Sequence, residues 1–258
     1  MFIPLTPDVT QGFRWTAFDG YTFAEAYRTA PVVAAEIHQI GACGPIVFEA
    51  TDTVPQPAVL LTLGAASLIR AGQWTGTYVP CSLRMHPFGA TSNSEAVLYD
   101  PDSLCLSNPD GMRAVDQTGA VTEDFRRIKS FVGAFHRFAR HTERACRMLA
   151  KAELFIPARD LSALDHEACE GLFVIDRARL AKLPQTWLAP LHSTGALEIA
   201  YAHLTSLGTL ANLRRTFVRR DGQAEADKGQ GAAADNFLSA MGAAYGSEAE
   251  TDLLLDLS

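Results

Sequence analysis

The sequence has no long apolar run of the kind that a membrane-spanning helix needs. No apolar stretch approaches the roughly 18 residues of such a helix. The opening residues, MFIPLTPDVTQGF, also lack the basic segment and the continuous apolar core of a signal peptide. These absences predict a protein without a transmembrane segment, located in the cytoplasm.

Paired cysteines are missing as well. The five cysteines are an odd number, and no two of them form a CxxC pair. In a chain of 258 residues this pattern argues against a disulfide framework and favours reduced thiols in a reducing compartment. Only Cys146 and Cys169 lie near basic residues that would lower a thiol pKa, and neither has a neighbouring base.

Motifs that hold phosphates or activate a serine are absent. The sequence contains no GxxxxGK[ST], no GxGxxG after a predicted strand and no GxSxG. We therefore expect no cofactor and assign no catalytic residue from motifs. Whether the protein is an enzyme stays open at this point.

The seven histidines do not form a credible metal site. His141 and Glu143, with His192 or His203 downstream, copy the residue order of an iron-binding triad. Side chains two residues apart on a helix point about 200° away from each other, however, because each residue turns by about 100°. We expect no bound metal, and we interpret His203 as a core histidine that is hydrogen-bonded by Ser206 or a strand carbonyl.

The residues before position 120 have the composition of short strands. Val, Ile, Thr and aromatic residues dominate runs such as GPIVFEA and PAVLLTLG, and Gly, Pro and Asp stand at the breaks. NPDG at 108–111 and DQTG at 116–119 place Pro, Asp and Gly where tight turns need them. The pattern predicts an antiparallel-rich sheet, or a partial barrel, of short strands.

From Thr122 the apolar period changes to that of a long helix. Apolar side chains recur three and four residues apart as far as Leu149, and Thr122 is placed to cap the helix. Shorter helices follow a predicted strand at 172–175, the first of them capped by Asp176. The outer face of the long helix is basic, with Arg126, Arg127, Lys129, Arg137, Arg140, Arg144, Arg147 and Lys151.

Composition divides the chain near residue 220. Residues 220–258 hold eight acidic and two basic residues and so carry −6 of the formal net charge of −7. Their first part has the composition of a linker, and their acids are candidates for weak pairing with the basic helix. An acidic chain argues against nucleic acid as a partner. We predict one α+β domain over 1–219, β-rich over 1–120 with helical residues 121–219 packed on it, followed by an acidic linker and a short C-terminal segment over 220–258.

The stretch QWTGTYVPCSLRMHPF at residues 73–88 concentrates aromatic residues, an arginine and a histidine. Aromatic residues and arginine are enriched at recognition hot spots. If WTGTYV is a strand, Trp74, Gly76 and Tyr78 share one face, and the glycine lets a ligand or another backbone approach between the two rings. The candidate binding residues are Glu36, Trp74, Tyr78, Arg84, His86 and Phe88.

Three interpretations of this stretch stay open. Trp74 and Tyr78 form either the core of the sheet, with Gly76 accommodating a packed helix, or the lining of a binding groove. Catalysis by the polar residues is the third interpretation. Beyond the proline that ends the predicted strand, Arg84, His86 and Phe88 are expected to alternate with apolar residues.

Three segments resemble motifs shared by the SapC-like family of bacterial proteins. They are PIVF at 45–48, WTGTYVPCSLRMHPF at 74–88 and YAHLTSLGTL at 201–210. The segment GLFVIDRARLAKLP is similar to the family in style, and the resemblance runs from about residue 3 to 219. The family name implies association with a bacterial surface layer, and the resemblance carries no catalytic residue to this chain.

Two function hypotheses from different classes follow. The first is a non-catalytic accessory protein that binds a peptide or a protein in a bacterial envelope or surface-layer system, with self-association left open. The second is an enzyme or enzyme subunit that modifies a peptide or a small polar substrate with Arg84, His86 and Glu36. An enzyme requires a pocket in which these side chains converge, whereas a binding module requires an aromatic groove or an exposed sheet edge.

Overall fold

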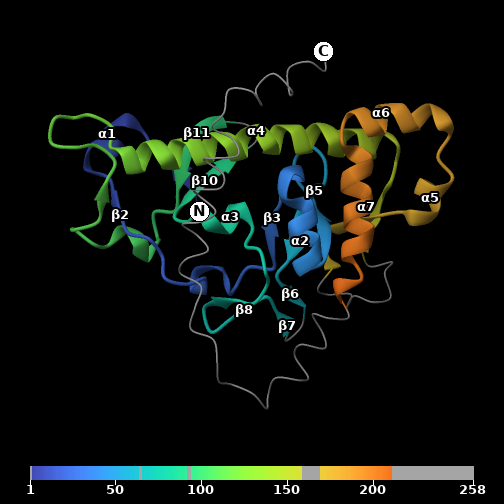
Figure 1. Cartoon of the computed structure of the whole chain (residues 1–258), viewed down its shortest axis with the longest axis horizontal. Helices are drawn as coiled ribbons and strands as arrows, with labels where there is room; N and C mark the ends of the chain where they lie inside the picture. The colour runs from blue at the N-terminus through green and yellow to red at the C-terminus, as the bar shows by residue number, and fades with distance from the viewer. Residues whose placement is uncertain (1, 64–65, 92–93, 159–168, 211–258) are drawn as a thin grey trace. The chain divides into compact units, whose positions relative to one another are not determined.

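The computed structural model describes residues 2–63, 66–91, 94–158 and 169–210, whose helices and strands are drawn in Figure 1. The chain divides into two units, Met1–Arg219 and Arg220–Ser258. All described residues belong to the first unit. The acidic segment 220–258, with its predicted linker and pairing, lies outside them.

A five-stranded antiparallel sheet forms the centre of the first unit. Central strand β4 has Ile46, Val47 and Phe48 buried in succession, so both of its faces are covered. The register between β4 and β5 runs from Ile46↔Val59 to Glu49↔Gln56. In order across the sheet, the strands are β13 (Phe155–Pro157), β14 (Leu172–Ile175), β4 (Ile46–Glu49), β5 (Gln56–Leu60) and β3 (Thr29–Pro31).

The smaller strands form a three-stranded sheet and three two-stranded pairs. The sheet has the order β1 (Ile3–Pro4), β11 (Ser94–Tyr99) and β10 (Phe88–Thr91). The two-stranded pairs are β2 (Arg14–Trp15) with β12 (Met112–Arg113), β6 (Thr62–Leu63) with β7 (Ala66–Ser67), and β8 (Ile69–Arg70) with β9 (Gln73–Trp74).

Helix α4 (Glu123–Lys151) is 29 residues long and crosses both sheet regions (Figure 1). Its predicted cap is confirmed, because the Thr122 hydroxyl accepts a hydrogen bond from the Phe125 amide. Its inner face contacts β10 and β11, and farther along it contacts the C-terminal helices. The other helices are α1 (Pro7–Gly12), α2 (Ile37–Cys43), α3 (Cys81–Arg84), α5 (Arg177–Ala181), α6 (Leu188–Ser193) and α7 (Ala196–Ser206).

Short 3₁₀ helices complete the connections, and two helices cover the central sheet. Helix α7 contacts β4, β14, α2 and α4, and Figure 1 shows α2 and α7 beside the sheet. The 3₁₀ helices include η1 (Thr22–Ala24), η2 (Ala34–Glu36), η3 (Leu104–Leu106) and η6 (Gln185–Trp187).

The predicted α+β class is confirmed, together with several local features. The Gly111 and Gly119 amides donate to the Asn108 and Asp116 carbonyls, so both predicted turns form. The Asp176 carboxylate accepts from the amides of α5, as expected of a cap. The strand predicted at 172–175 is confirmed as β14, and together with β13 it extends the same sheet as β4.

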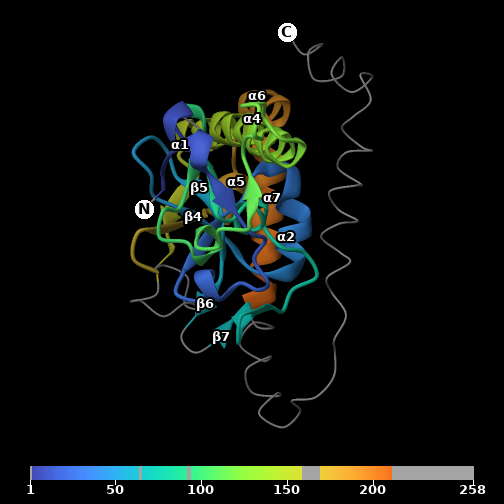
Figure 2. The same ribbon diagram turned by 90° about the vertical axis from the view of Figure 1, so that its left-hand side faces the viewer.

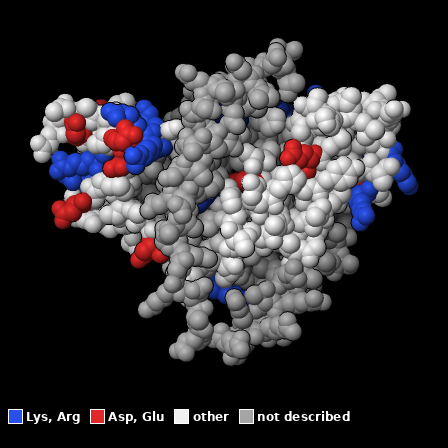
Figure 3. Space-filling model, in the orientation of Figure 1, with Lys and Arg blue, Asp and Glu red and all other residues white. Residues whose placement is uncertain are grey.

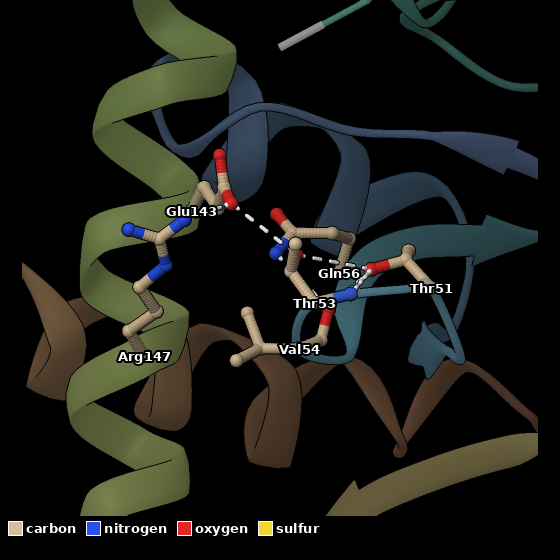
Figure 4. A network of polar contacts seen from close by, with 6 residues as sticks. All are labelled: Thr51, Thr53, Val54, Gln56, Glu143 and Arg147. Carbon is tan, nitrogen blue, oxygen red and sulfur yellow. Dashed lines mark hydrogen bonds and ion pairs between the residues drawn. The ribbon is translucent and has the colours of Figure 1, made fainter. Parts of the chain in front are cut away.

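A polar network fastens the β4–β5 connection to α4 (Figure 4). The Thr53 hydroxyl donates to Glu143 Oε1 at 3.2 Å, and Arg147 Nη2 donates to the same oxygen at 2.6 Å. Thr51 and Gln56 bond the Val54 carbonyl and so hold the loop in shape. Glu143 is buried, and because both bonds meet at its Oε1 atom it joins the loop to α4 and supports the fold.

Candidate functional site

The stretch 73–88 is not the extended strand that its sequence predicts. Strand β9 ends at Trp74, residues 75–80 belong to no strand, and α3 begins directly after Pro80. Trp74, Gly76 and Tyr78 therefore do not share a strand face, and helix α3 removes the expected alternation beyond the proline. Pro80 has φ and ψ angles of −54° and 140° as the N-cap residue, and helix α3 begins directly after it.

Trp74 is buried in the main hydrophobic core, and Gly76 lies against its ring. A Cβ atom at Gly76 would stand 2.8 Å from Trp74 Nε1 and 3.1 Å from the Cβ of Cys43, the last residue of α2. The space beside the glycine is thus filled by its own neighbouring indole and by a packed helix. This arrangement agrees with the core interpretation of Trp74 and leaves no room for a ligand there.

We expect Gly76→Ala to lower the free energy of unfolding by about 1–3 kcal/mol, because the added methyl group must displace the indole or α2. Gly133→Ala is the matched control. It lies inside α4 with only the tip of Arg137 within 4 Å, so alanine there should stabilise by about 0.5–1 kcal/mol. Urea unfolding of both variants checks the pair. Equal effects of the two substitutions would contradict the contact with Trp74.

Glu36 is the centre of a buried hydrogen-bond network. Its Oε2 atom accepts from the Cys81 amide at 2.8 Å and from the Tyr78 hydroxyl at 3.2 Å. Its Oε1 atom accepts from the Val33 amide at 3.3 Å. Arg84 Nη2 donates to the Tyr78 hydroxyl at 2.8 Å and to Cys81 Sγ at 2.9 Å. Four of these residues, Glu36, Tyr78, Cys81 and Arg84, form what we call the Glu36 network.

The electrostatics of the Glu36 network do not favour nucleophilic chemistry. Burial raises the pKa of Glu36, and burial with the nearby Glu36 carboxyl raises the pKa of Tyr78. The same two causes raise the pKa of the Cys81 thiol to about 12, so the reactive thiolate is scarce at neutral pH. The network therefore serves to hold η2 against the start of α3.

Arg84 is not the solvated arginine that a groove would present. Its guanidinium carbon lies 5.0 Å from the ring centroid of Tyr78 and 5.9 Å from that of Phe131. These distances are those of cation–π contacts, which add to its hydrogen bonds. Loss of Arg84 should therefore cost stability.

His86 points to a different set of partners. Its ring stacks on Phe23 with centroids 3.8 Å apart and an interplanar angle of 8°. Its Nε2 atom is 2.8 Å from the Ser103 hydroxyl oxygen. That oxygen also accepts from the Cys105 amide, so Ser103 links the His86 ring to η3. Burial lowers the pKa of His86, which agrees with a neutral ring.

Phe88 is a core residue of a second cluster. Its ring lies 5.3 Å from Trp15 and 5.8 Å from Phe13, and it also contacts Phe125 of α4. The structure thus divides the six candidate residues among three environments. It joins Glu36, Tyr78 and Arg84, and it places Trp74, His86 and Phe88 elsewhere.

Sequence reasoning missed an aromatic segment that lies over Trp74 and His86. The segment FDGYTFAEAY, residues 18–27, holds four aromatic residues in ten, and this density was the signal that could have found it. Its rings contact one another and reach the buried pair, with Tyr21 6.2 Å from Trp74. We define the aromatic cluster as Phe18, Tyr21, Phe23, Tyr27, Trp74 and His86.

The aromatic cluster is partly open to solvent. Phe18, Tyr21 and Phe23 are half-buried, and Tyr27 is 38 % exposed. The charge of Arg84 acts on Tyr21, although burial dominates and raises the pKa of that tyrosine. The cluster therefore offers a set of rings supported from below by core residues.

His203 is confirmed as a hydrogen-bonded core histidine. Its Nδ1 atom is 2.8 Å from the Ile46 carbonyl, and its Nε2 atom accepts from the Ile175 amide at 3.2 Å. The accepting role of Nε2 places the ring proton on Nδ1, which donates to the carbonyl. Ser206 instead bonds the His203 carbonyl and the Ile46 amide. Among the described residues, no three His, Cys, Asp or Glu side chains are grouped to hold a metal ion.

Three of the four segments that carry the sequence resemblance meet around His203, and residues 74–88 lie elsewhere. PIVF forms β4, YAHLTSL forms the end of α7, and GLFVI forms β14, which pairs with β4 through Phe173↔Phe48. Within the described part of the chain, no helix is both long enough and apolar enough to span a bilayer. Searches of curated proteins and of solved structures each found no match. The model of the SapC family, in contrast, matches residues 5–213, and the chain therefore belongs to the SapC family.

Proposed function

We propose that this protein is a non-catalytic accessory protein that binds a peptide or a protein through the aromatic cluster. The observation that supports this most is the row of partly exposed rings, Phe18, Tyr21, Phe23 and Tyr27, held in place by Trp74 and His86. Rings that are fixed before binding lose little conformational entropy when a partner arrives. Aromatic residues of this kind form the hot spots of many interfaces.

The proposed setting is a bacterial envelope or surface-layer system, which the SapC family name suggests. We further propose that the protein works in the cytoplasm. No disulfide joins any of the five cysteines, which supports a reducing compartment.

An enzymatic function has less support. Glu36 and Arg84 form hydrogen bonds within the Glu36 network, whereas His86, a member of the aromatic cluster, bonds Ser103. The polar residues that an enzyme would need to converge on one substrate thus lie in two separate networks. Binding by aromatic rings needs no such convergence.

Selection of a phage-displayed random peptide library on the full-length protein tests the proposal. Peptides selected on the wild type should bind Tyr27→Ala roughly 30-fold more weakly, because truncation of a hot spot costs about 2 kcal/mol. Leu104→Ala is the matched control, since Leu104 is an 87 % exposed apolar residue outside the cluster. Peptides that bind both variants as well as the wild type, or a selection that enriches no sequence, would contradict the proposal.

A further inference from the structure

The outer face of α4 carries a line of seven basic side chains, with a gap of about two turns between Lys129 and Arg137. At about 100° per residue, its members fall within an arc of about 80° on the side of the helix away from the core. At a rise of about 1.5 Å per residue, the line is about 37 Å long. We define the basic stripe as the exposed residues Arg126, Lys129, Arg137, Arg140, Arg144, Arg147 and Lys151.

Most of this charge has no opposite charge beside it. Arg126 pairs with Glu123 and Arg147 pairs with Glu143. At the end where α4 begins, basic and acidic side chains are interleaved (left-hand end of Figure 3), and Glu123 also pairs with Arg127 there. For the other five members of the stripe, the described residues provide no ion pair, and these five are Lys129, Arg137, Arg140, Arg144 and Lys151.

Exposed apolar residues stand on helices that flank the stripe. Helices α1, α4 and α6 lie along the top of the described residues in both Figure 1 and Figure 2. Val9 of α1 is 40 % exposed, and Leu188 at the start of α6 is 45 % exposed. Trp187, directly before α6, is half-buried. Helices α1 and α6, which lie with α4 along the top of the described residues, thus each carry an exposed apolar residue.

We propose that this side binds the surface of a membrane that contains anionic phospholipids. The basic stripe would lie against the head groups, and Val9 and Leu188 would enter the boundary of the acyl chains. Because the apolar face of α4 is buried in the protein, the helix itself cannot insert, and the binding is peripheral. Stable peripheral binding requires two weak signals together, and the stripe and the apolar pair supply them.

The apolar pair distinguishes a lipid surface from other polyanions. A single-stranded nucleic acid is held by aromatic rings on which its bases stack, and no exposed residue of α4 is a Phe, Tyr or Trp. A duplex would use the positive charge but would gain nothing from exposed valine and leucine side chains. A flat anionic bilayer can contact both the positive charge and the apolar side chains, and its surface extends past the whole length of the stripe.

Sedimentation of the full-length protein with vesicles tests the proposal. The protein should sediment with phosphatidylcholine vesicles that contain phosphatidylserine and remain in solution with phosphatidylcholine alone. High salt should release it, because screening weakens the attraction of exposed charges. A protein that does not bind the anionic vesicles at low salt would overturn the proposal, even if another part of the chain covers the stripe.

Two matched pairs of substitutions locate the surface. Arg140→Gln with Arg144→Gln should raise the lipid concentration needed for half-binding about 25-fold, at about fivefold for each lost charge. Arg177→Gln with Lys182→Gln removes the same charge from exposed residues in and just after α5 and should change binding little. Equal effects of the two pairs would show a response to net charge alone and would refute the assignment to α4.

A third double variant tests the apolar contribution. Val9→Ser with Leu188→Ser should weaken binding to anionic vesicles roughly fivefold or more, since each buried methylene contributes to insertion. Two results together would overturn the choice of a lipid surface. The protein would bind a DNA duplex more tightly than vesicles, and this double variant would change neither binding. Far-UV circular dichroism confirms that each variant is folded, and the salt dependence of the wild type requires no variant.

Discussion

Replacing His203 by leucine is expected to lower the free energy of unfolding by about 2–5 kcal/mol. Leucine fills a similar volume, but it can neither donate to the Ile46 carbonyl nor accept from the Ile175 amide. Each buried group left without a partner costs about 1–3 kcal/mol. Urea unfolding measures the loss. His192→Leu, on the exposed surface of α6, is the control and should change stability by no more than about 0.5 kcal/mol.

The pH dependence of stability gives a second measurement on the same residue. Burial lowers the pKa of His203 to about 4, whereas an unfolded histidine titrates near 6.5. Between these values the unfolded chain binds a proton that the folded chain does not. The free energy of unfolding therefore falls as the pH drops from about 6.5 to about 4, by on the order of 3 kcal/mol.

Comparison of wild type and His203→Leu isolates this contribution. The variant should lose the His203 share of the pH slope and be destabilised most at neutral pH. His86, whose pKa is also lowered by burial, acts in the same direction in both proteins and cancels in the difference. Identical slopes in the two proteins would show that His203 is not buried in its neutral form.

Trp74→Ala is expected to cost about 3–5 kcal/mol of folding stability. The indole is buried in the main core, lies against Gly76 and contacts the ring of Tyr21, so its removal leaves a cavity lined by several elements. Thermal melting and solubility of the purified variant measure the effect. A Trp74→Ala protein that melts together with the wild type would contradict the core position of the ring.

Leu104→Ala is the matched control for this substitution. Leu104 is also a large apolar residue, but it is 87 % exposed, so its truncation should change stability by no more than about 0.5 kcal/mol. Because the Tyr21 ring contacts Trp74, loss of the indole should also disturb the aromatic cluster. Weaker peptide binding by Trp74→Ala therefore indicates a disturbed aromatic cluster only if this variant is folded.

The features that the sequence predicts correctly are those that depend on neighbouring residues. Helix α4 follows from its apolar period and from the Thr122 cap, and α5 follows from Asp176. The role of His203 is also readable, because a polar ring within an apolar stripe must find partners wherever the helix packs.

The features that the sequence does not predict depend on contacts between distant residues. The run WTGTYV has strand composition, yet helix α3 follows it. The first amide of that helix, Cys81, donates to Glu36, which lies 45 residues earlier in the chain. Glu36, Tyr78 and Arg84 lie together in one hydrogen-bond network, but local patterns contain no sign that His86 turns away to Ser103, 17 residues ahead. Tertiary contacts override strand propensity at this point.

The bridge made by His203 has a consequence for the order in which the protein can fold. Strand β4 is made early, but the side chain that bonds its Ile46 carbonyl is synthesised 157 residues later. Contacts between residues so far apart in the chain form slowly, because a large loop must close before they stabilise anything. During synthesis, therefore, β4 has an open edge until β14 has been made, and its Ile46 carbonyl lacks the His203 partner until α7 has left the ribosome.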